Sequence, residues 1–77
     1  MHIHLTLYSI LRKKLPPEAK GRAMLDFPEG STLADVLSRL EIQHRVVSIV
    51  NSRVENDLAY KLQEGDEVQF FVPIGGG

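Results

Sequence analysis

The sequence predicts an α+β domain in which one helix packs on one face of a mixed four- or five-stranded sheet. Three observations lead to this class. Several segments alternate apolar and polar residues with the period of a strand, a single segment carries a helical stripe, and strand-like segments lie on both sides of that helix. A chain of 77 residues is the size of one small domain.

The first two strand-like segments are residues 3–8 and 22–27, and both alternate apolar with polar side chains. Between them, residues 9–21 hold a short apolar pair that suits one helical turn, followed by Pro16 and Pro17. Consecutive prolines end any helix and begin a loop. These features predict a β-hairpin with a long connection.

Residues 32–40 form the clearest helix signal. Thr32 is placed to cap the first turn, and Asp35 three residues later can bond back to it in a variant of the capping box. A helix this short is marginal alone, so its apolar stripe must pack on the sheet. The stripe consists of residues spaced i, i+3, i+4 and i+7: Leu33, Val36, Leu37 and Leu40.

The second half of the chain predicts two further strands. Residues 46–50 form an apolar run closed by the turn-former Asn51, but their nearly continuous apolar character leaves the inward face undetermined. Residues 52–63 are polar and irregular, and we expect three side chains in them to anchor onto the core: Leu58, Tyr60 and Leu62.

The last strand spans residues 67–73 and follows a turn at Gly65. Its alternation places Phe70 toward the core, with Gln69 and Phe71 on the opposite face. An exposed aromatic beside the chain end is a candidate contact for a partner, although single exposed apolar residues are also common without any function.

Composition excludes several function classes. The chain has no cysteine and a formal net charge of -1, so it has neither thiol chemistry nor a field that attracts nucleic acid or anionic membranes. His2 and His4 share a strand face, but no third ligand accompanies them, so we expect no metal site. The basic run Arg12-Lys13-Lys14 suits a solvated face, or a docking patch for an acidic partner.

The start of the chain lacks the basic-then-apolar plan of a signal peptide, and no apolar run is long enough to span a bilayer. We therefore expect a cytoplasmic protein.

The chain ends in Gly75, Gly76 and Gly77, directly after the apolar strand. A frayed end is one interpretation, because chain termini are commonly disordered. The other is a tether without side chains that enters a channel too narrow for a Cβ atom. We therefore divide the chain into a folded domain, 1–74, and a flexible glycine tail, 75–77.

The order of elements resembles the ubiquitin-like β-grasp fold, and the chain end resembles that of the MoaD/ThiS family of sulfur carriers, most closely the MoaD branch. The resemblance rests on the Gly65-Asp66-Glu67-Val68 turn, the Phe70-Phe71 pair, Pro73 and the terminal glycines. It extends to Leu11-Arg12, to Gly30-Ser31-Thr32 and to Val50-Asn51. Two departures concern the branch: Val72 replaces a proline frequent in MoaD-type chains, and the triple glycine also occurs in ThiS-type tails.

The resemblance implies a function that needs few residues. An ATP-using activating enzyme of the MoeB/ThiF kind would adenylate the carboxylate of Gly77, and a sulfur donor would convert it to a thiocarboxylate. Gly75 and Gly76 would thread the partner's active site, and the partner would be contacted by Gln69, Phe71, Pro73 and Ile74. ATP would bind to the activating partner, and the chain itself would hold no cofactor.

The sequence does not decide which partner receives the sulfur. In MoaD-like carriers it is the large subunit of molybdopterin synthase (MoaE-like), and in ThiS-like carriers it is thiazole synthase. A ubiquitin-fold interaction module with an inert tail is a third possibility from a different functional class. An independent enzyme fits least, because no catalytic triad is evident in the sequence.

Overall fold

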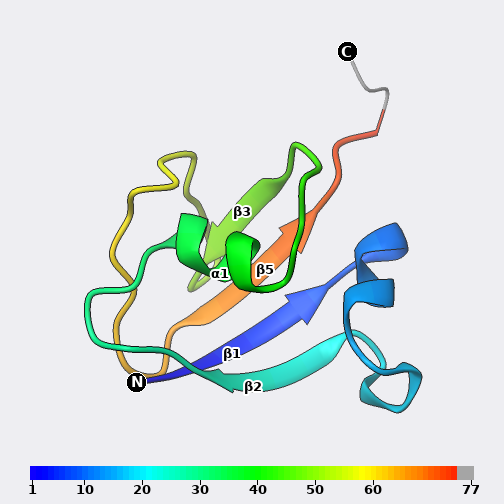
Figure 1. Ribbon diagram of the computed structural model, residues 1–77. Coiled ribbons are helices and arrows are strands. Elements are labelled where there is room, and N and C mark those ends of the chain that lie inside the picture. The colour runs from blue at the N-terminus through cyan, green and yellow to red at the C-terminus, as the bar shows by residue number, and fades with distance from the viewer. Residues whose placement is uncertain (75–77) are drawn as a thin grey trace.

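A computed structural model describes residues 1–74 of the chain (Figure 1). It contains five strands, one α-helix and two 3₁₀ helices. In chain order they are β1 (His2–Leu7), η1 (Ser9–Lys14), η2 (Pro17–Ala19), β2 (Arg22–Asp26), α1 (Leu33–Arg39), β3 (Val47–Val50), β4 (Arg53–Val54) and β5 (Glu67–Phe71).

The strands form one mixed sheet in the order β2-β1-β5-β3-β4. The central pair, β1 and β5, is parallel, with Leu5 opposite Val68, and the other neighbours run antiparallel. The two ends of the chain thus form the middle of the sheet, and the long connection through α1 covers one face (Figure 1). This is the α+β layout that the sequence predicts.

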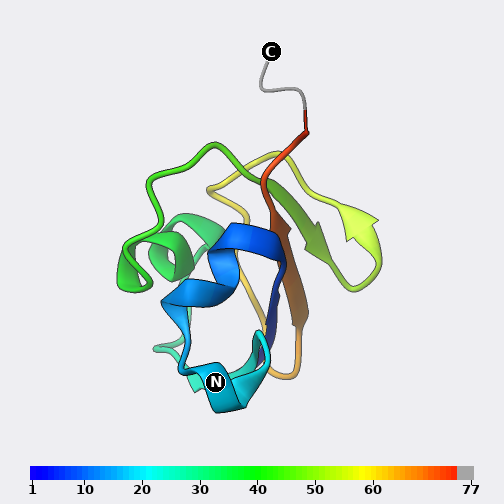
Figure 2. The same cartoon turned by 90° about the vertical axis from the view of Figure 1, so that its right-hand side faces the viewer.

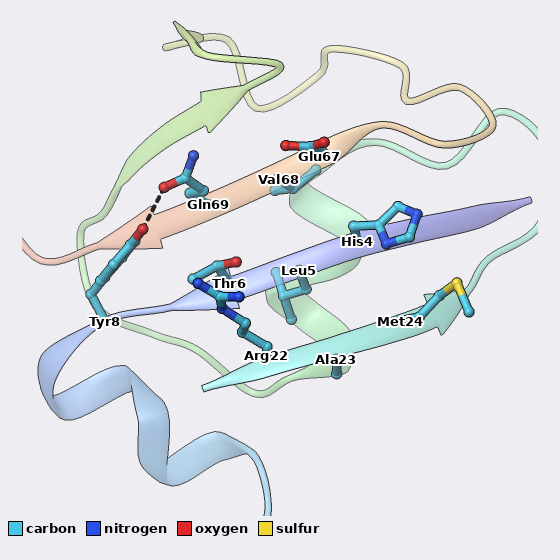
Figure 3. Close-up of a pocket in the computed structure, with 10 residues that line it drawn as sticks. All are labelled: His4, Leu5, Thr6, Tyr8, Arg22, Ala23, Met24, Glu67, Val68 and Gln69. Carbon is cyan, nitrogen blue, oxygen red and sulfur yellow. Dashed lines mark hydrogen bonds between the residues drawn. The ribbon is translucent and has the colours of Figure 1, made fainter. Parts of the chain in front are cut away.

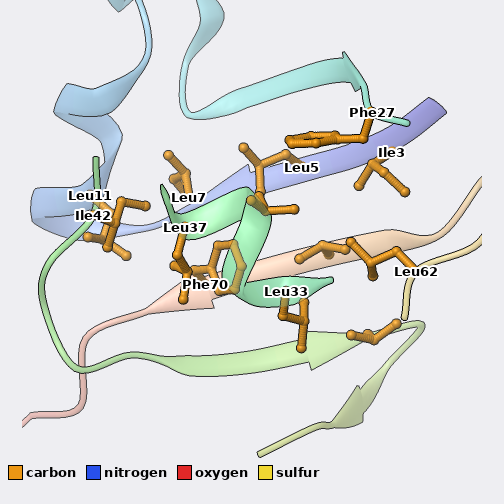
Figure 4. Close-up of a cluster of buried hydrophobic side chains, with 13 residues drawn as sticks. Ile3, Leu5, Leu7, Leu11, Phe27, Leu33, Leu37, Ile42, Leu62 and Phe70 are labelled. Carbon is orange, nitrogen blue, oxygen red and sulfur yellow. The ribbon is translucent and has the colours of Figure 1, made fainter. Parts of the chain in front are cut away.

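The core lies between α1 and the sheet face that carries Ile3, Leu5 and Leu7 of β1 (Figure 4). Val68 and Phe70 of β5 are fully buried beside them. The helix contributes its predicted stripe, since Leu33, Val36 and Leu37 are buried and Leu40 packs at the margin of the cluster. The core is completed by Leu11, Phe27, Ile42, Val50 and Leu62.

The capping box at the start of α1 is present as predicted. The Asp35 backbone N–H donates to Thr32 Oγ1 at 3.3 Å, and the Thr32 backbone N–H donates to Asp35 Oδ2 at 2.8 Å. Two backbone donors that have no partner within the helix are thereby satisfied. This fixes the first turn of a helix of only seven residues.

The hairpin of β1 and β2 is also confirmed, and its connection folds into η1 and η2. Leu11 on η1 is buried and closes one end of the core. Gly21 returns the chain to the sheet at φ 78°, where an added Cβ would lie 2.6 Å from the Leu7 carbonyl oxygen. Only glycine fits this close approach of two backbones.

Several details differ from the sequence predictions. β3 and β5 are shorter than expected, and β5 ends at Phe71 rather than at residue 73. The two-residue strand β4 was not predicted, because Arg53–Val54 is too short to show an alternation. Leu62 and Tyr60 pack on the core as expected, but Leu58 is 41% exposed, so its prediction as an anchor is wrong.

Candidate functional site

The last strand, β5, separates its side chains between the two faces of the sheet. Val68 and Phe70 are fully buried against α1, whereas Gln69 and Phe71 lie half-buried on the opposite face, which we call the outer face. The orientation predicted for the two phenylalanines is therefore confirmed. The register of β5 against its parallel neighbour β1 is fixed, because a slip by one residue would turn Phe71 toward the core and Phe70 toward the outer face.

Phe71 belongs to a cluster of apolar side chains on the outer face. Val47 lies opposite Phe71, and Ile49 lies opposite both Gln69 and Val54. Strand register places these side chains on one face, and Val54 is 62% exposed. We call Val47, Ile49, Val54 and Phe71 the outer-face patch. Val54 is exposed and the other three are half-buried, and neighbouring apolar side chains of this kind make the patch a candidate interaction surface.

The patch exists because β3 has an unusual orientation. The polar residue Ser48 points into the core and is 2% exposed, while its apolar neighbours Val47 and Ile49 point outward. The Ser48 hydroxyl has no hydrogen-bond partner among the described residues. An interior hydroxyl without a partner is unfavourable, so this orientation is not the one that side-chain polarity alone would select.

A polar groove adjoins the patch across β5 and β1. It has a volume of about 560 Å³ and runs over β2, β1 and β5 on the outer face (Figure 3). His4 lies opposite Glu67 and Thr6 lies opposite Gln69, so β1 and β5 line one face together. The Tyr8 hydroxyl donates to Gln69 Oε1 at 2.6 Å, which holds the Gln69 side chain beside the patch.

Beyond β5 the chain leaves the sheet directly after Phe71, at the end of the sheet where β3 begins (Figure 2). Pro73 is half-buried and lines a hollow of about 360 Å³ together with residues of β3 and α1. Ile74 is fully exposed. Of the predicted site residues, Gln69, Phe71, Pro73 and Ile74 thus follow one another from the outer face to the end of the described chain.

Gly75, Gly76 and Gly77, which the sequence predicts to be the reactive tail, lie outside the described residues 1–74. Within 1–74, no group of three or more acidic or histidine side chains could hold a metal ion. His2 instead contacts Glu64, with 3.2 Å between His2 Nδ1 and Glu64 Oε2.

The carboxylate of Glu64 also accepts the His2 backbone N–H at 2.9 Å, and this bond holds the pKa of Glu64 below its ordinary value. The pair lies at the start of β1, far along the strand from Tyr8. No helix within residues 1–74 is long and apolar enough to cross a membrane.

The family model described as ThiS family matches residues 12–77, which is most of the chain and includes the terminal glycines. The chain belongs to the ThiS family. No curated protein matches the chain. The MoaD/ThiS resemblance inferred from the sequence is therefore confirmed at the level of the family, a family of ubiquitin-like sulfur carriers.

Solved structures agree with this ThiS family assignment in fold. SAMP1 from Haloferax volcanii is 19% identical with a TM-score of 0.73, and each chain covers 100% of the other. A putative molybdopterin converting factor, subunit 1, from Pyrococcus furiosus is 19% identical with a TM-score of 0.75, covering 96% of this chain and 99% of that one. Subunit 1 and 2 of the molybdopterin-converting factor from Helicobacter pylori form a complex whose matched chain is 15% identical, with a TM-score of 0.65 and full coverage of both chains. The ubiquitin-like β-grasp fold is thus confirmed.

The sequence of this ThiS family chain indicates Phe71 and Gln69 as site residues but does not indicate Val47, Ile49 and Val54. The available signal was the run 46–50, in which apolar residues occupy both faces. A strand that is apolar on both faces is either buried on both sides or exposes one of them to a partner. The missing information was the neighbour of β3 in the sheet.

Proposed function

We propose that the chain carries sulfur on its C-terminal carboxylate as the small subunit of a molybdopterin synthase. The observation that carries the proposal is the position of the outer-face patch beside the root of a glycine tail that the ThiS family match includes. The patch would dock the partner enzymes, and the tail would present Gly77 inside them.

The chemistry proceeds on the Gly77 carboxylate. A carboxylate oxygen attacks the α-phosphorus of ATP bound to an activating enzyme of the MoeB/ThiF kind, and pyrophosphate leaves. Sulfur at the oxidation level of sulfide (HS⁻) then attacks the acyl carbon, the bond to AMP breaks, and loss of the proton gives the thiocarboxylate. Adenylation is needed because a free carboxylate is a poor acyl electrophile. All catalytic groups belong to the partner, and the chain binds no cofactor of its own.

The free energy gained by docking must offset the conformational entropy that is lost when the tail is ordered. Fixing three residues costs roughly 3–6 kcal/mol at about 1–2 kcal/mol per residue. Full burial of an exposed phenylalanine contributes about 1.5–3 kcal/mol, and Phe71 is already half-buried, so about half of that gain remains. Burial of Phe71 alone therefore does not offset the cost of ordering the tail, and Val54 and the other patch residues must contribute to docking as well.

The molybdopterin pathway is favoured by the structural likeness to two proteins whose names contain molybdopterin converting factor. One of them forms a complex between subunits 1 and 2, and this supports a MoaE-like large subunit as the partner here. The second candidate, favoured by the description of the family model itself, is a carrier that supplies sulfur to thiazole synthase for thiamine.

The test is an intact-mass measurement after incubation with an activating enzyme, ATP and a sulfur source. We expect a gain equal to the replacement of one oxygen by sulfur, and no gain in a variant that lacks Gly77. An unchanged mass with an activating enzyme that modifies its own carrier would refute the carrier function and leave an interaction module. The thiocarboxylated chain, offered separately to a molybdopterin synthase large subunit and to thiazole synthase, then separates the two pathways.

A further inference from the structure

The sheet ends at β2, and the outer edge of this strand has a defined set of backbone groups. The Leu7 N–H donates to the Gly21 carbonyl at 2.7 Å, and the Phe27 N–H donates to the Met1 carbonyl at 2.9 Å. These bonds flank the antiparallel pairing of β1 with β2. Because residues in such a ladder alternate in direction, Ala23 and Leu25 point their backbone groups toward β1. The backbone groups of Arg22, Met24 and Asp26 therefore point away from the sheet.

Within residues 1–74, no strand pairs with this outer edge (Figure 1). One of its carbonyls is occupied by a side chain, since the Arg39 guanidinium donates to the Asp26 carbonyl oxygen and lies 4.6 Å from the centre of the Phe27 ring. The amide of Asp26 and the backbone groups of Met24 and Arg22 remain directed outward. An edge of this kind is a template for another strand.

The sequence of β2 is complementary to itself. When Arg22-Ala23-Met24-Leu25-Asp26 is laid antiparallel against a second copy with Met24 opposite Met24, each Arg22 falls opposite an Asp26. The side chains of Arg22, Met24 and Asp26 all lie on the outer face and are exposed, with Met24 62% and the Asp26 side chain 75% exposed. Opposite charges that face each other across strands are stabilising, and like charges are destabilising.

We propose that β2 is a homodimerisation edge, at which two copies of the chain pair antiparallel about a two-fold axis through Met24. The Met24 N–H and carbonyl of each copy bond to those of the other, and each Asp26 N–H donates to the Arg22 carbonyl across the axis. These bonds leave the contact between Arg39 and the Asp26 carbonyl in place. An isologous contact of this kind closes on itself, so it gives a dimer and no fibre.

The occupant is a second copy because of the charge pattern. Charged residues on edge strands normally prevent pairing, since they oppose most incoming strands. Here the two charges have opposite signs and equal spacing from Met24, so the chain's own β2 supplies a partner for both. The Asp26 carboxylate already lies 3.4 Å from the N-terminal ammonium of its own chain, and its 75% exposed side chain leaves room for Arg22 of the second copy. An unrelated strand would need an acid and a base at the same two positions.

The dimer is compatible with the proposed function and does not depend on it. β1 separates β2 from β5, so pairing at β2 leaves the outer-face patch and Pro73 accessible. A contact made by one five-residue strand is below the ~1,200 Å² of a standard interface, so the dimer is weak and forms at high protein concentration.

The experiment is sedimentation equilibrium of the full chain from low micromolar to millimolar concentration, with three variants. Asp26→Arg places two arginines opposite each other at both ends of the pairing, and we expect the dimer to weaken by at least about tenfold. The double variant Arg22→Asp with Asp26→Arg reverses both charges and should restore dimerisation to within about threefold. Glu29→Arg changes the net charge as much as Asp26→Arg, lies outside the paired segment, and should leave the dimer unchanged.

NMR of a mixed sample, one half carrying ¹³C-methyl methionine, supplies the second readout. An intermolecular contact between Met24 methyl groups supports the proposal. A chain that is monomeric at millimolar concentration overturns it. A dimer whose affinity is unchanged by Asp26→Arg also overturns the proposal, and so does a dimer that Phe71→Asp abolishes. In either case another face makes the contact. Unfolding curves for each variant exclude loss of fold as the cause.

Discussion

The side chains of Asn51 and Asp66 join the two turns at one end of the sheet. Asn51 Nδ2 donates to Asp66 Oδ1 at 2.9 Å, and Asn51 Oδ1 accepts the Glu67 backbone N–H at 2.9 Å. Asp66 is buried, and its second oxygen accepts the Gln63 N–H at 2.9 Å. The bond links the turn after β3 to the turn before β5, and so fixes how β3 and β5 enter the sheet.

We expect Asn51→Ala to lower the free energy of unfolding by about 1–3 kcal/mol, because it leaves the buried Asp66 carboxylate without one partner. Asn51 also has φ 50°, a conformation that asparagine tolerates better than alanine. Asn51→Gly separates the two effects, since glycine accepts this φ but makes no side-chain bond. Urea unfolding measures the stability of both variants, and Gln43→Ala, at an exposed position, is the control. Equal stability of Asn51→Gly and the wild type would contradict the role of the bond between Asn51 and Asp66.

The capping box predicts a second stability effect. Thr32→Ala removes the acceptor for the Asp35 N–H and should destabilise the fold by about 1 kcal/mol. Thr32→Ser keeps the hydroxyl and should stay within about 0.5 kcal/mol of the wild type, because serine caps as well as threonine. Thermal unfolding of the two variants side by side checks the prediction, and equal losses would show that the methyl group matters instead.

The contact between Glu64 and His2 predicts a pH dependence. The folded pKa of Glu64 lies below its ordinary value of 4.5, mainly because the His2 N–H donates to the carboxylate. A lowered folded pKa stabilises the fold above 4.5, and this contribution is lost as the pH falls from 4.5 through the folded pKa. The Glu64 side chain is 63% exposed, so screening by solvent keeps the effect small.

Glu64→Gln keeps an acceptor for the His2 N–H but cannot titrate. Its unfolding midpoint should therefore fall less than that of the wild type between neutral pH and pH values below 4.5. Glu18→Gln, on η2, serves as the matched control. Parallel loss of stability in Glu64→Gln and the wild type over this range would rule out the linkage.

How far the sequence predicts this protein depends on the element. The helix is predictable because Thr32, Asp35 and the apolar stripe all indicate the same boundaries, and the terminal motif predicts the family. Strand β3 is different, because the sequence 46–50 is apolar on both faces and only its place beside β5 turns Val47 and Ile49 outward. The burial of Ser48 runs against its polarity, so the run 46–50 indicates two apolar faces but not which of them forms the outer-face patch.

Docking of partners through the outer-face patch gives a prediction for affinity. Phe71→Ala should weaken binding to the activating enzyme and to the large subunit by about tenfold, since loss of about 1.4 kcal/mol corresponds to that factor. Val54→Ala should act in the same direction by a smaller amount, because valine buries less apolar area. Ile10→Ala is the control, an exposed apolar residue on η1. Calorimetric titration measures all three, and unchanged affinity in Phe71→Ala would exclude the patch as the docking surface.

Substitution in the tail should separate docking from chemistry. Gly76→Val adds a branched Cβ to a segment that, in the proposed mechanism, enters a channel wide enough only for bare backbone. We therefore expect thiocarboxylate formation to fall by more than about tenfold, a loss of more than about 1.4 kcal/mol of transition-state stabilisation. Binding to the activating enzyme should change far less, because the outer-face patch is intact, and unfolding stability should match the wild type. The intact-mass assay and the calorimetric titration are run on the same preparation. Normal sulfur loading of Gly76→Val would contradict the narrow channel. Equal losses of binding affinity and of sulfur loading would contradict separate roles for the patch, in docking, and for the tail, in the reaction.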